Sequence, residues 1–486
     1  MKILVIQLAR LGDIFMTWPA LRALKRSHPQ AEIHLLTRPR FGAAVEGLTA
    51  VDRHISLPVS TILAPLVQDE ADFDTSLERL NETVDMLVAE NYDTVVNLTF
   101  SPVSSYLTHA VSGLHTTVLG YTRYNDGTLC LADEVSSYFY AQVGPERANR
   151  VHLADIFASM LNVEYIEQDW LAPVLAEPSF ALPDCYMALH VGASEQHKSL
   201  SPQAWGRTLA YFNRRYQGLP IVLIGAAGEA SLAEEIIKAA PQAAIINMVG
   251  KTTVSELFSV VQEAEILVGC DSAPIHMASL TDTPTLNVSV GKVNYWETGP
   301  KATLGFIYRI ENEEKLVTER LGEVLALLLE GEVASELIPR AAGLVSYAQN
   351  DFGIEAFQWG MVQALYLGGP YPIADRMEII QGAAKLQDIN NFAMEQIALI
   401  PEKGLQAIGP LLDSAEEVIQ NISRVVPELS PLINWYQAEK IRIGPGSLEE
   451  ICATALSIHQ RLARHVEAYV PHDALIQSEE ALDGTL

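Results

Sequence analysis

The first third of the chain alternates apolar runs with amphipathic stretches. Residues 2–8 form a compact run rich in Ile, Leu and Val, and a short loop with Gly12 and Asp13 follows before a helical pattern. This order predicts a strand, a tight loop and a helix. Further strands are predicted at Glu32–Leu36, Thr94–Leu98 and Thr116–Leu119, and helices at Ser76–Ala89 and Ala148–Leu161. Alternating β and α units predict a mostly parallel sheet that is covered on both faces.

A proline-punctuated stretch, Leu171–Asp184, is the predicted linker to a second series of the same kind. Thr253 and Glu256 have the spacing of a capping box, which predicts a helix start. The predicted strands are Tyr186–Val191, Pro220–Ile224, Ala244–Met248, Ile266–Gly269 and Thr285–Val290, and the helices are Pro202–Tyr216, Glu229–Ala239, Val254–Glu263 and Pro274–Ser279. The pattern therefore predicts a second open α/β domain.

After about Glu313 the strand pattern fades and helical patterns dominate to the end. Gly and Pro residues divide this region, at Gly368-Gly369-Pro370, Gly404, Pro427, Pro431 and Gly444-Pro445-Gly446. We therefore expect three parts, residues 1–175 and 176–335 as α/β domains and residues 336–486 as an all-helical extension.

Composition narrows the classes of partner. The 486 residues are 49% hydrophobic and 19% charged, which is typical of a globular chain and excludes disorder as the main state. The net charge of −28 repels nucleic acids and anionic bilayers, so no nucleic-acid partner is expected.

Cysteine usage and hydropathy bear on the compartment. The 4 cysteines lie far apart without a CxxC pair, so neither a zinc site nor a disulfide framework is expected, and a reducing cytoplasm fits. No apolar run approaches the roughly 18 residues of a membrane-spanning helix, so at most peripheral membrane contact is expected.

The first loop contains Gly12 but lacks the GxGxxG pattern, which disfavours a dinucleotide at this strand. Asp13 follows that glycine at the carboxyl end of a predicted strand, where ligands bind in open α/β sheets. A carboxylate there could accept a proton from a substrate hydroxyl. The alternative is that Asp13 only caps the following helix.

A second candidate is the strand-to-helix passage Gly269–His276. Free N–H groups and the dipole at this helix start favour an anion, and the small side chains of Ser272 and Ala273 allow close approach to the backbone. The alternative is an ordinary turn in which Asp271 is the N-cap.

A third candidate is the loop after the strand that ends near His190. Gly192, Ala193 and Ser194 precede Lys198, whose charge could neutralise a pyrophosphate leaving group, although a solvated surface lysine fits as well. Glu229 closes the passage Gly225–Glu229 that follows the next predicted strand, and it could hold a sugar or ribose hydroxyl or only favour a helix start.

Asp72-Phe73-Asp74 has the DxD form with which metal-dependent sugar transferases hold a nucleotide. It lies in an acidic run before a helix and not after a buried strand, which favours a solvated, helix-initiating role. No His/Cys/Asp cluster elsewhere has metal-ligand spacing, so no metal site is expected.

Together these passages resemble glycosyltransferase family 9, the ADP-heptose:lipopolysaccharide heptosyltransferase family. Lys2–Arg26, with Arg10-Leu11-Gly12-Asp13, looks like the family's opening. His190–Trp205 looks like its nucleotide-phosphate loop, and Gly250–Pro300 like its most specific signature. The resemblance covers roughly residues 1–320.

The resemblance implies a GT-B architecture, in which two Rossmann-like domains face a cleft, and inverting, metal-independent sugar transfer without a cofactor. Asp13 would be the general base, and the first domain, with Arg10 and Gly12, would serve the acceptor. Donor-phosphate binding would fall on Lys198, Asp271, Ser272 and Ala273. Nucleotide or sugar binding would fall on Gly192, Ala193, Ser194, Glu229 and His276. The donor would be a nucleotide sugar such as ADP-heptose, and the acceptor a glycan, lipid or protein.

Several positions depart from the family pattern. Val191, Cys270 and Ala273 stand where the family usually has proline, asparagine and glycine, which reshapes the donor pocket without removing a charge. His54–Asp74 contains no Lys or Arg, whereas family members that act on the anionic inner core tend to carry basic residues there. We therefore expect a less anionic acceptor, or a donor other than ADP-heptose.

Two alternatives remain open from the sequence. One is a catalytically inactive nucleotide-sugar-binding scaffold that acts through its helical tail, and the other is a sugar-nucleotide epimerase with two Rossmann-like domains. Asp13 and Lys198 favour a transferase over the scaffold. The expected location is cytoplasmic or peripheral at the inner membrane, and the helical tail is a candidate surface for a protein partner or for dimerisation.

Overall fold

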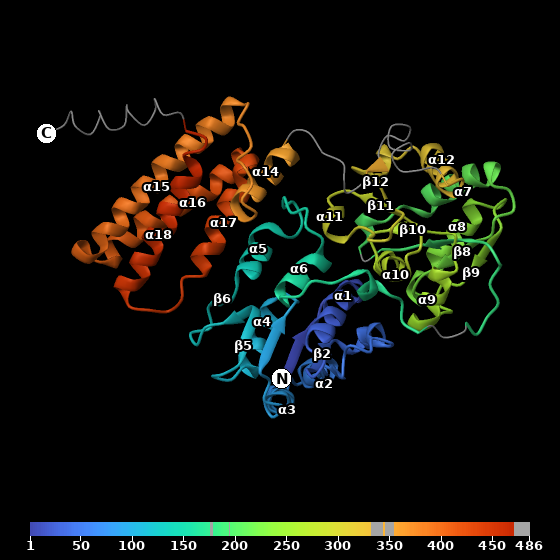
Figure 1. Cartoon of the computed structure of the whole chain (residues 1–486), viewed down its shortest axis with the longest axis horizontal. Helices are drawn as coiled ribbons and strands as arrows, with labels where there is room; N and C mark the ends of the chain where they lie inside the picture. Colours follow the sequence, from blue (N-terminus) through green and yellow to red (C-terminus); the bar gives the residue numbers. More distant parts are fainter. Residues whose placement is uncertain (175–177, 194, 332–343, 346–353, 471–486) are drawn as a thin grey trace. The chain divides into compact units, whose positions relative to one another are not determined.

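The computed structural model describes residues 1–174, 178–193, 195–331, 344–345 and 354–470 (Figure 1). Its internal contacts divide the chain into two compact units. The first unit consists of residues 1–99, 110–118 and 151–349. The second consists of residues 100–109, 119–150 and 350–486.

The first unit begins with a parallel sheet whose strands run in the order β3-β2-β1-β4. Its central strand is a continuous apolar run, as is typical of parallel strands that helices cover on both faces. The strands are β1 (Lys2–Ile6), β2 (Glu32–Thr37), β3 (Arg53–Ser56) and β4 (Thr94–Asn97). The α-helices of this part are α1 (Leu11–Ser27), α2 (Val59–Leu63), α3 (Phe73–Val88) and α6 (Leu153–Met160).

A second sheet of the same unit has the order β13-β12-β11-β10-β7-β8-β9 and is parallel except for β13. The strands are β7 (Met187–His190), β8 (Ile221–Ile224), β9 (Ile245–Asn247), β10 (Ile266–Cys270), β11 (Thr285–Val290), β12 (Gly305–Ile310) and β13 (Leu344–Val345). Its α-helices are α7 (Pro202–Arg215), α8 (Ala230–Ala239), α9 (Val254–Gln262), α10 (Ala273–Thr281), α11 (Tyr295–Thr298) and α12 (Thr318–Leu329). The predicted second α/β series is confirmed.

Helix α1 joins the two halves of this unit. Its Trp18 is fully buried and stacks on Phe258 of α9 with ring centroids 5.8 Å apart, and Phe15 meets the same ring edge-on at 5.3 Å. Aromatic contacts of this kind add to the free energy gained by burial. The packing brings the N-terminus of α1 to the second sheet.

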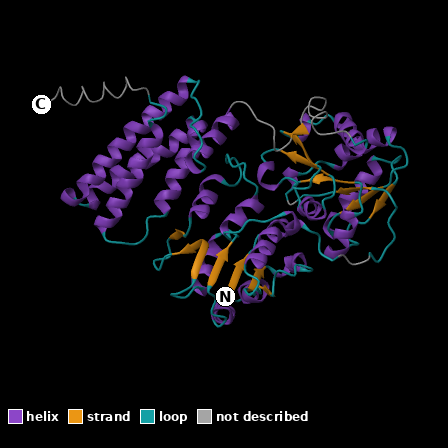
Figure 2. Cartoon of the chain, in the orientation of Figure 1, coloured by secondary structure: helices purple, strands orange, loops and turns teal. Residues whose placement is uncertain are grey.

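The second unit is mostly helical, and Figure 2 shows residues 354–470 as helices and loops only. Its long helices share one core that includes Leu386, Leu432, Tyr436 and Leu462. The elements are α4 (Pro102–Val111), β5 (Thr117–Arg123), β6 (Leu129–Leu131), α5 (Glu134–Gln142), α14 (Ile354–Tyr366), α15 (Met377–Lys403), α16 (Leu405–Val425), α17 (Ser430–Ile441) and α18 (Leu448–Val466). The predicted helical C-terminal region is confirmed, although Pro431 lies in the first turn of α17 and does not end a helix.

Residues of the predicted first domain pack with these helices. Gln142 Nε2 at the end of α5 donates to the carbonyl of Pro431 at 2.9 Å, and Arg442 Nη2 donates to Glu134 Oε1 at 2.7 Å. The predicted boundaries at residues 175 and 335 lie outside the described residues, so the three-part division stays a prediction.

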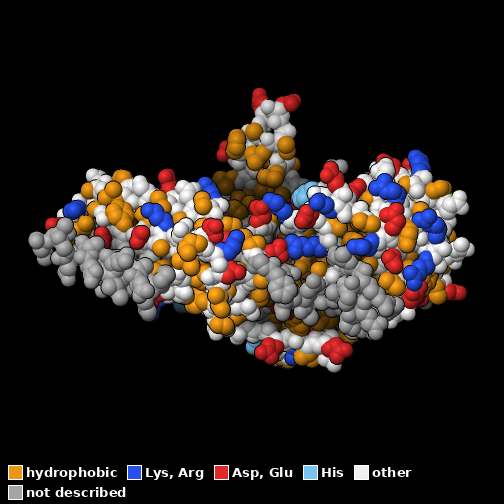
Figure 3. Space-filling view, turned by 90° about the horizontal axis from the view of Figure 1, so that it is seen from above, with side chains coloured by type: hydrophobic (Ala, Val, Ile, Leu, Met, Phe, Trp, Pro, Cys, Tyr) orange, Lys and Arg blue, Asp and Glu red, His pale blue; other side chains and the backbone are white. Residues whose placement is uncertain are grey.

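The helices of the described segments do not combine the length and apolar character that a membrane crossing requires. Figure 3 shows one face on which Lys and Arg side chains are interspersed with Asp and Glu. The negative net charge is therefore not a single acidic patch on that face.

Candidate active site

The loop after β1 places Asp13 in the first turn of α1. The backbone N–H of Arg10 donates to Asp13 Oδ2 at 2.9 Å, which satisfies one of the free donors at the helix start. Asp13 therefore does cap this helix, as one of the two interpretations of the sequence predicts. The bond engages one carboxylate oxygen, so capping and proton transfer are compatible.

Gly12 allows the start of α1 to approach the start of α10. A Cβ at Gly12 would lie 2.7 Å from Cδ2 of His276 and 3.5 Å from the Cα of Ala273. A larger residue at this position would have to displace the His276 ring. The N-terminal ends of α1 and α10, which the sequence indicates as two separate candidate sites, therefore lie next to each other.

Charged side chains from both halves of the unit meet at this point. Arg10 Nη2 lies 2.7 Å from Glu195 Oε1, and Lys198 Nζ lies 3.8 Å from the same oxygen. Lys198 Nζ also lies 3.6 Å from Asp271 Oδ2. We call Arg10, Asp13, Glu195, Lys198 and Asp271 the inter-sheet site.

The N-terminus of α10 lacks a side-chain cap. Ser272 is the N-cap residue, but its hydroxyl donates back to the carbonyl of Cys270 at 2.8 Å and accepts no helical N–H. Asp271 does not cap the helix either, because its Oδ1 accepts from Thr298 Oγ1 at 2.7 Å. With Ala273 as the first helical residue, the backbone there is open to a small anion.

The pKa of Asp13 is raised and that of His276 is lowered, and burial is the main cause of both shifts. Burial raises the pKa of Asp13, the Arg10 amide and guanidinium oppose that rise, and the nearby Asp271 carboxylate adds to it. Burial lowers the pKa of His276 to about 4, against the pull of Asp271. At neutral pH His276 is therefore neutral and Asp13 is a base with raised proton affinity.

Glu229 packs against the loops that follow β7 and β8. A Cβ at Gly192 would lie 1.6 Å from Glu229 Oε1, so a larger residue there would displace this carboxylate. Glu229 Oε2 accepts from the Ala226 N–H at 2.7 Å and lies 3.7 Å from His190 Nε2. The predicted helix-start role of Glu229 is confirmed, and its ligand role stays a prediction.

The remaining predicted residues fall in three places. Ala193 packs on the core of the second sheet. Ser194 lies outside the described residues. Asp72 caps α3 by accepting from the Thr75 N–H at 2.9 Å, and Asp74 stands in that helix's first turn, so the helix-initiating interpretation of the DxD sequence is confirmed. Among the described residues, no group of three or more His, Cys, Asp or Glu side chains could hold a metal ion.

The sequence alone assigned no role to Glu195 or Thr298. In the structure Glu195 accepts a hydrogen bond from Arg10, and Thr298 donates one to Asp271. The only local indication for Glu195 is its position three residues before Lys198, an (i, i+3) charge pair. Its contact with Arg10 spans 185 residues of sequence and leaves no local pattern.

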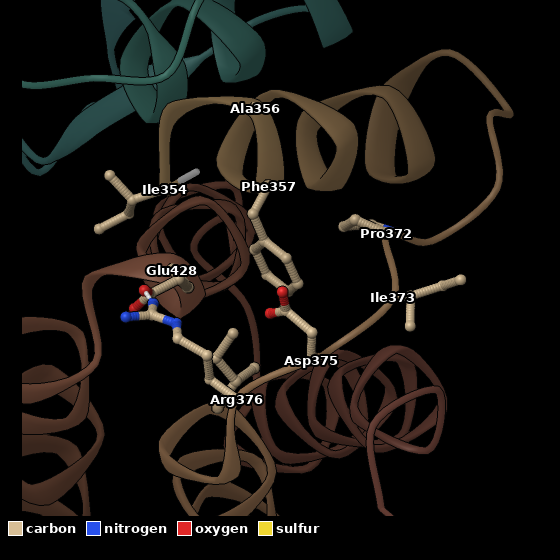
Figure 4. A pocket seen from close by; sticks show the side chains of 9 residues that line it. Ile354, Ala356, Phe357, Pro372, Ile373, Asp375, Arg376 and Glu428 are labelled. Atoms are coloured by element: carbon tan, nitrogen blue, oxygen red, sulfur yellow. Dashed lines mark ion pairs between the residues drawn. The ribbon is translucent and has the colours of Figure 1, made fainter. Parts of the chain in front are cut away.

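The helical unit has hollows of its own, which contain none of the predicted site residues. One cavity has a volume of about 450 Å³. Figure 4 shows Phe357 and Asp375 among its lining side chains, beside the ion pair of Arg376 with the buried Glu428. A second cavity, of about 260 Å³, is lined mainly by aliphatic side chains of α15, α16 and α18.

Comparison with known proteins shows which family this chain resembles. Residues 83–303 match the family model described as glycosyltransferase family 9 (heptosyltransferase). The predicted resemblance to family 9 is confirmed. The protein is a glycosyltransferase.

Individual relatives are distant. The chain is similar to lipopolysaccharide heptosyltransferase 3 of Escherichia coli strain K12, at 21% identity over 301 residues, which cover 57% of this chain and 79% of the relative. Among solved structures it is similar to E. coli heptosyltransferase WaaC with ADP, with a TM-score of 0.50 and 17% identity over 68% of this chain and 99% of that one. The glycosyltransferase family 9 structure from Veillonella parvula DSM 2008 has a TM-score of 0.49 at 17% identity and covers 70% of this chain and 96% of that one. The predicted GT-B type of fold is confirmed, with the helical region in addition.

Proposed function

We propose that this glycosyltransferase moves a sugar, heptose or a similar one, from a nucleoside diphosphate to a hydroxyl of lipopolysaccharide or another glycoconjugate. The observation that carries the proposal is the convergence of a base, a cation and an open helix start at one place. Asp13 comes from the first turn of α1, Lys198 from the 3-10 helix Gln196–Lys198 after β7, and the open helix start belongs to α10.

Each group has a role in an inverting displacement. Asp13 takes the proton of the acceptor hydroxyl while the hydroxyl oxygen forms a bond to the anomeric carbon. The bond from that carbon to the diphosphate oxygen breaks on the opposite face, and the electron pair leaves with the nucleoside diphosphate. Lys198 and the N–H groups at Ser272 and Ala273 stabilise the charge that develops on the leaving group.

The other predicted residues complete this assignment. Gly192 and Glu229 border the nucleotide or sugar, His276 contributes a neutral ring at α10, and Gly12 keeps the two helix starts close. Because Lys198 and a helix dipole already offset the diphosphate charge, we propose that transfer needs neither metal nor cofactor.

The names of the relatives support the choice of substrates. Lipopolysaccharide heptosyltransferase 3 and WaaC with ADP favour an adenine nucleotide sugar and a lipopolysaccharide acceptor. The absence of Lys and Arg from residues 54–74 favours an acceptor that is less anionic than the inner core. We propose the cytoplasm or the surface of the inner membrane as the place where the protein acts, and the docking of a protein partner on the helical unit stays a prediction.

The test is a transfer assay with the purified protein and a panel of ADP-, UDP- and GDP-sugars on delipidated and intact glycolipid acceptors. We expect one donor to be consumed with inverted anomeric configuration, at the same rate with and without EDTA. Retained configuration, or loss of activity in EDTA that manganese restores, would contradict the proposal and return attention to Asp72 and Asp74.

A further inference from the structure

Glu195 bridges two cations that belong to different halves of the first unit. Arg10 stands before α1, and Lys198 stands in the short 3-10 helix Gln196–Lys198 after β7. Both approach the same carboxylate oxygen, Arg10 at 2.7 Å and Lys198 at 3.8 Å. The Glu195 carboxylate therefore occupies a position that the side chains of both Arg10 and Lys198 reach.

The two contacts differ in kind. The Arg10 contact is a hydrogen-bonded ion pair, whereas the Lys198 distance is beyond hydrogen-bond range and gives only electrostatic attraction. The Glu195 side chain is 39% exposed and that of Arg10 is 54% exposed, so water already solvates the pair and separating the two charges costs little free energy. This bridge is easily exchanged for another anion.

Asp271 is a different kind of partner for Lys198. It is only 13% exposed, and Thr298 Oγ1 donates to it at 2.7 Å, which fixes the carboxylate in place. When Glu195 turns away, the fixed Asp271 carboxylate, with its Oδ2 3.6 Å from Lys198 Nζ, still attracts the lysine to the start of α10. The lysine therefore stays in position for a ligand.

We propose that Arg10 and Lys198 together clamp the donor diphosphate, and that Glu195 is a stand-in anion that holds both cations while the donor is absent. This inference rests on the proposed function and deepens it, because it moves Arg10 from the acceptor to the donor. A diphosphate presents oxygens to two cations at once, and guanidinium suits such contacts. Glu195 then competes with the donor for the same charges.

The experiment is calorimetric titration of the full chain with ADP, UDP and GDP, followed by titration of each variant with the nucleotide that the wild type binds most tightly. We expect Glu195→Gln to tighten that binding several-fold, because the competing charge is lost. We expect Arg10→Gln to weaken it about tenfold, and Arg10→Lys to weaken it less. When Glu195→Gln is combined with Arg10→Gln, it should increase nucleotide affinity less than it does alone, because the contact between Glu195 and Arg10 no longer exists.

The matched control is the ion pair of Arg215, the last residue of α7, with Glu330, the residue that follows α12 in the same unit. Its contact is also 2.7 Å, and its side chains are 41% and 36% exposed. Arg215→Gln and Glu330→Gln should leave the dissociation constant within about twofold of the wild type. Thermal melting of each variant separates loss of binding from loss of folding.

Three results would overturn the inference. Unchanged nucleotide affinity in Arg10→Gln, with a raised KM for the acceptor, would return Arg10 to the acceptor side. Weaker binding in Glu195→Gln would make Glu195 a support of the loop and not a competitor. Absence of binding to all three nucleotides by the wild type would overturn the proposed function together with the clamp.

Discussion

Two half-buried carboxylates, Asp13 in the first unit and Glu416 in the second, show how environment separates a reactive group from a structural one. Burial raises the pKa of Asp13, and the Arg10 contacts do not cancel the rise. Burial also acts on Glu416, but Lys440, Gln437 and Tyr436 outweigh it and lower the pKa. The hydrogen-bonding and charged partners of a carboxylate, and not burial alone, therefore decide whether its pKa rises or falls.

The geometry around the two groups explains the difference. Glu416 accepts hydrogen bonds from Lys440, Gln437 and the Tyr436 hydroxyl, the last at 3.1 Å, so α17 is tied to α16 at this carboxylate. Asp13 accepts one backbone bond and faces a second carboxylate, Asp271. Asp13 therefore binds a proton more readily than an ordinary aspartate, whereas Glu416 releases its proton more readily than an ordinary glutamate.

The largest effect is expected from Asp13→Asn. Asparagine keeps an oxygen that can accept the Arg10 N–H, so the helix start is retained while the base is lost. We expect transfer to fall by about 10²- to 10⁴-fold, with nucleotide affinity nearly unchanged, as measured by initial rates and by calorimetry.

The control for this variant is Asp72→Asn, because Asp72 also accepts a backbone N–H at a helix start, at 2.9 Å from Thr75. It should leave the rate unchanged. If Asp13→Asn loses nucleotide binding as well as rate, Asp13 has a structural role and the comparison with Glu416 fails.

A smaller effect is expected from Glu416→Gln, which should lower stability by about 1–3 kcal/mol and leave nucleotide affinity intact. Because the folded-state pKa lies below the ordinary glutamate value, the ionised form stabilises the protein at neutral pH, and this contribution is lost as the pH falls through the folded pKa. Thermal melts at pH 7 and pH 4 should differ less for the variant than for the wild type.

Glu417→Gln is the matched control for Glu416→Gln, because Glu417 is its exposed neighbour on α16. Its melting temperature should follow the wild type at both pH values. Equal losses in the two variants would show that the Glu416 hydrogen bonds add no stability.

The smallest effect concerns pH. A base must be ionised to accept a proton, so transfer should decline as the pH falls through the raised pKa of Asp13, above the ordinary aspartate range. Asp271→Asn removes a carboxylate that raises this pKa, so the acid limb of kcat/KM should move to lower pH. A limb that stays in place, or moves to higher pH, would exclude electrostatic coupling between the two carboxylates.

Much of the fold could be predicted because buried parallel strands are continuous apolar runs. Thr285–Val290 is β11 with the predicted bounds, and the Thr253–Glu256 capping box starts α9 as expected. β3 was not predicted, because an edge strand with one buried residue in four lacks an apolar run. α6 begins at Leu153, later than its pattern predicts, because His152 accepts the Ala154 N–H at 3.1 Å and caps it.

The site was predictable only in part, for a physical reason. Lys198 and Asp271 follow β7 and β10, which are neighbours in one parallel sheet and bring their carboxyl ends to one edge, whereas Asp13 follows β1 of the other sheet. Sequence offered capping and proton transfer as alternatives for Asp13 but could not reveal that Glu195 pairs with Arg10, since that contact depends on how the two halves of the unit pack. Local patterns specify helix starts, and tertiary packing specifies which charges meet.

The most direct test of the central claim is calorimetric titration of the full chain with ADP, UDP, GDP and CMP, first without metal and then with magnesium. The account predicts that one nucleoside diphosphate binds with a stoichiometry of about one without metal, and that Lys198→Ala weakens this binding about tenfold. Binding of none of the four, binding only with magnesium, or unchanged affinity in Lys198→Ala would contradict a donor site built from Lys198 and the start of α10.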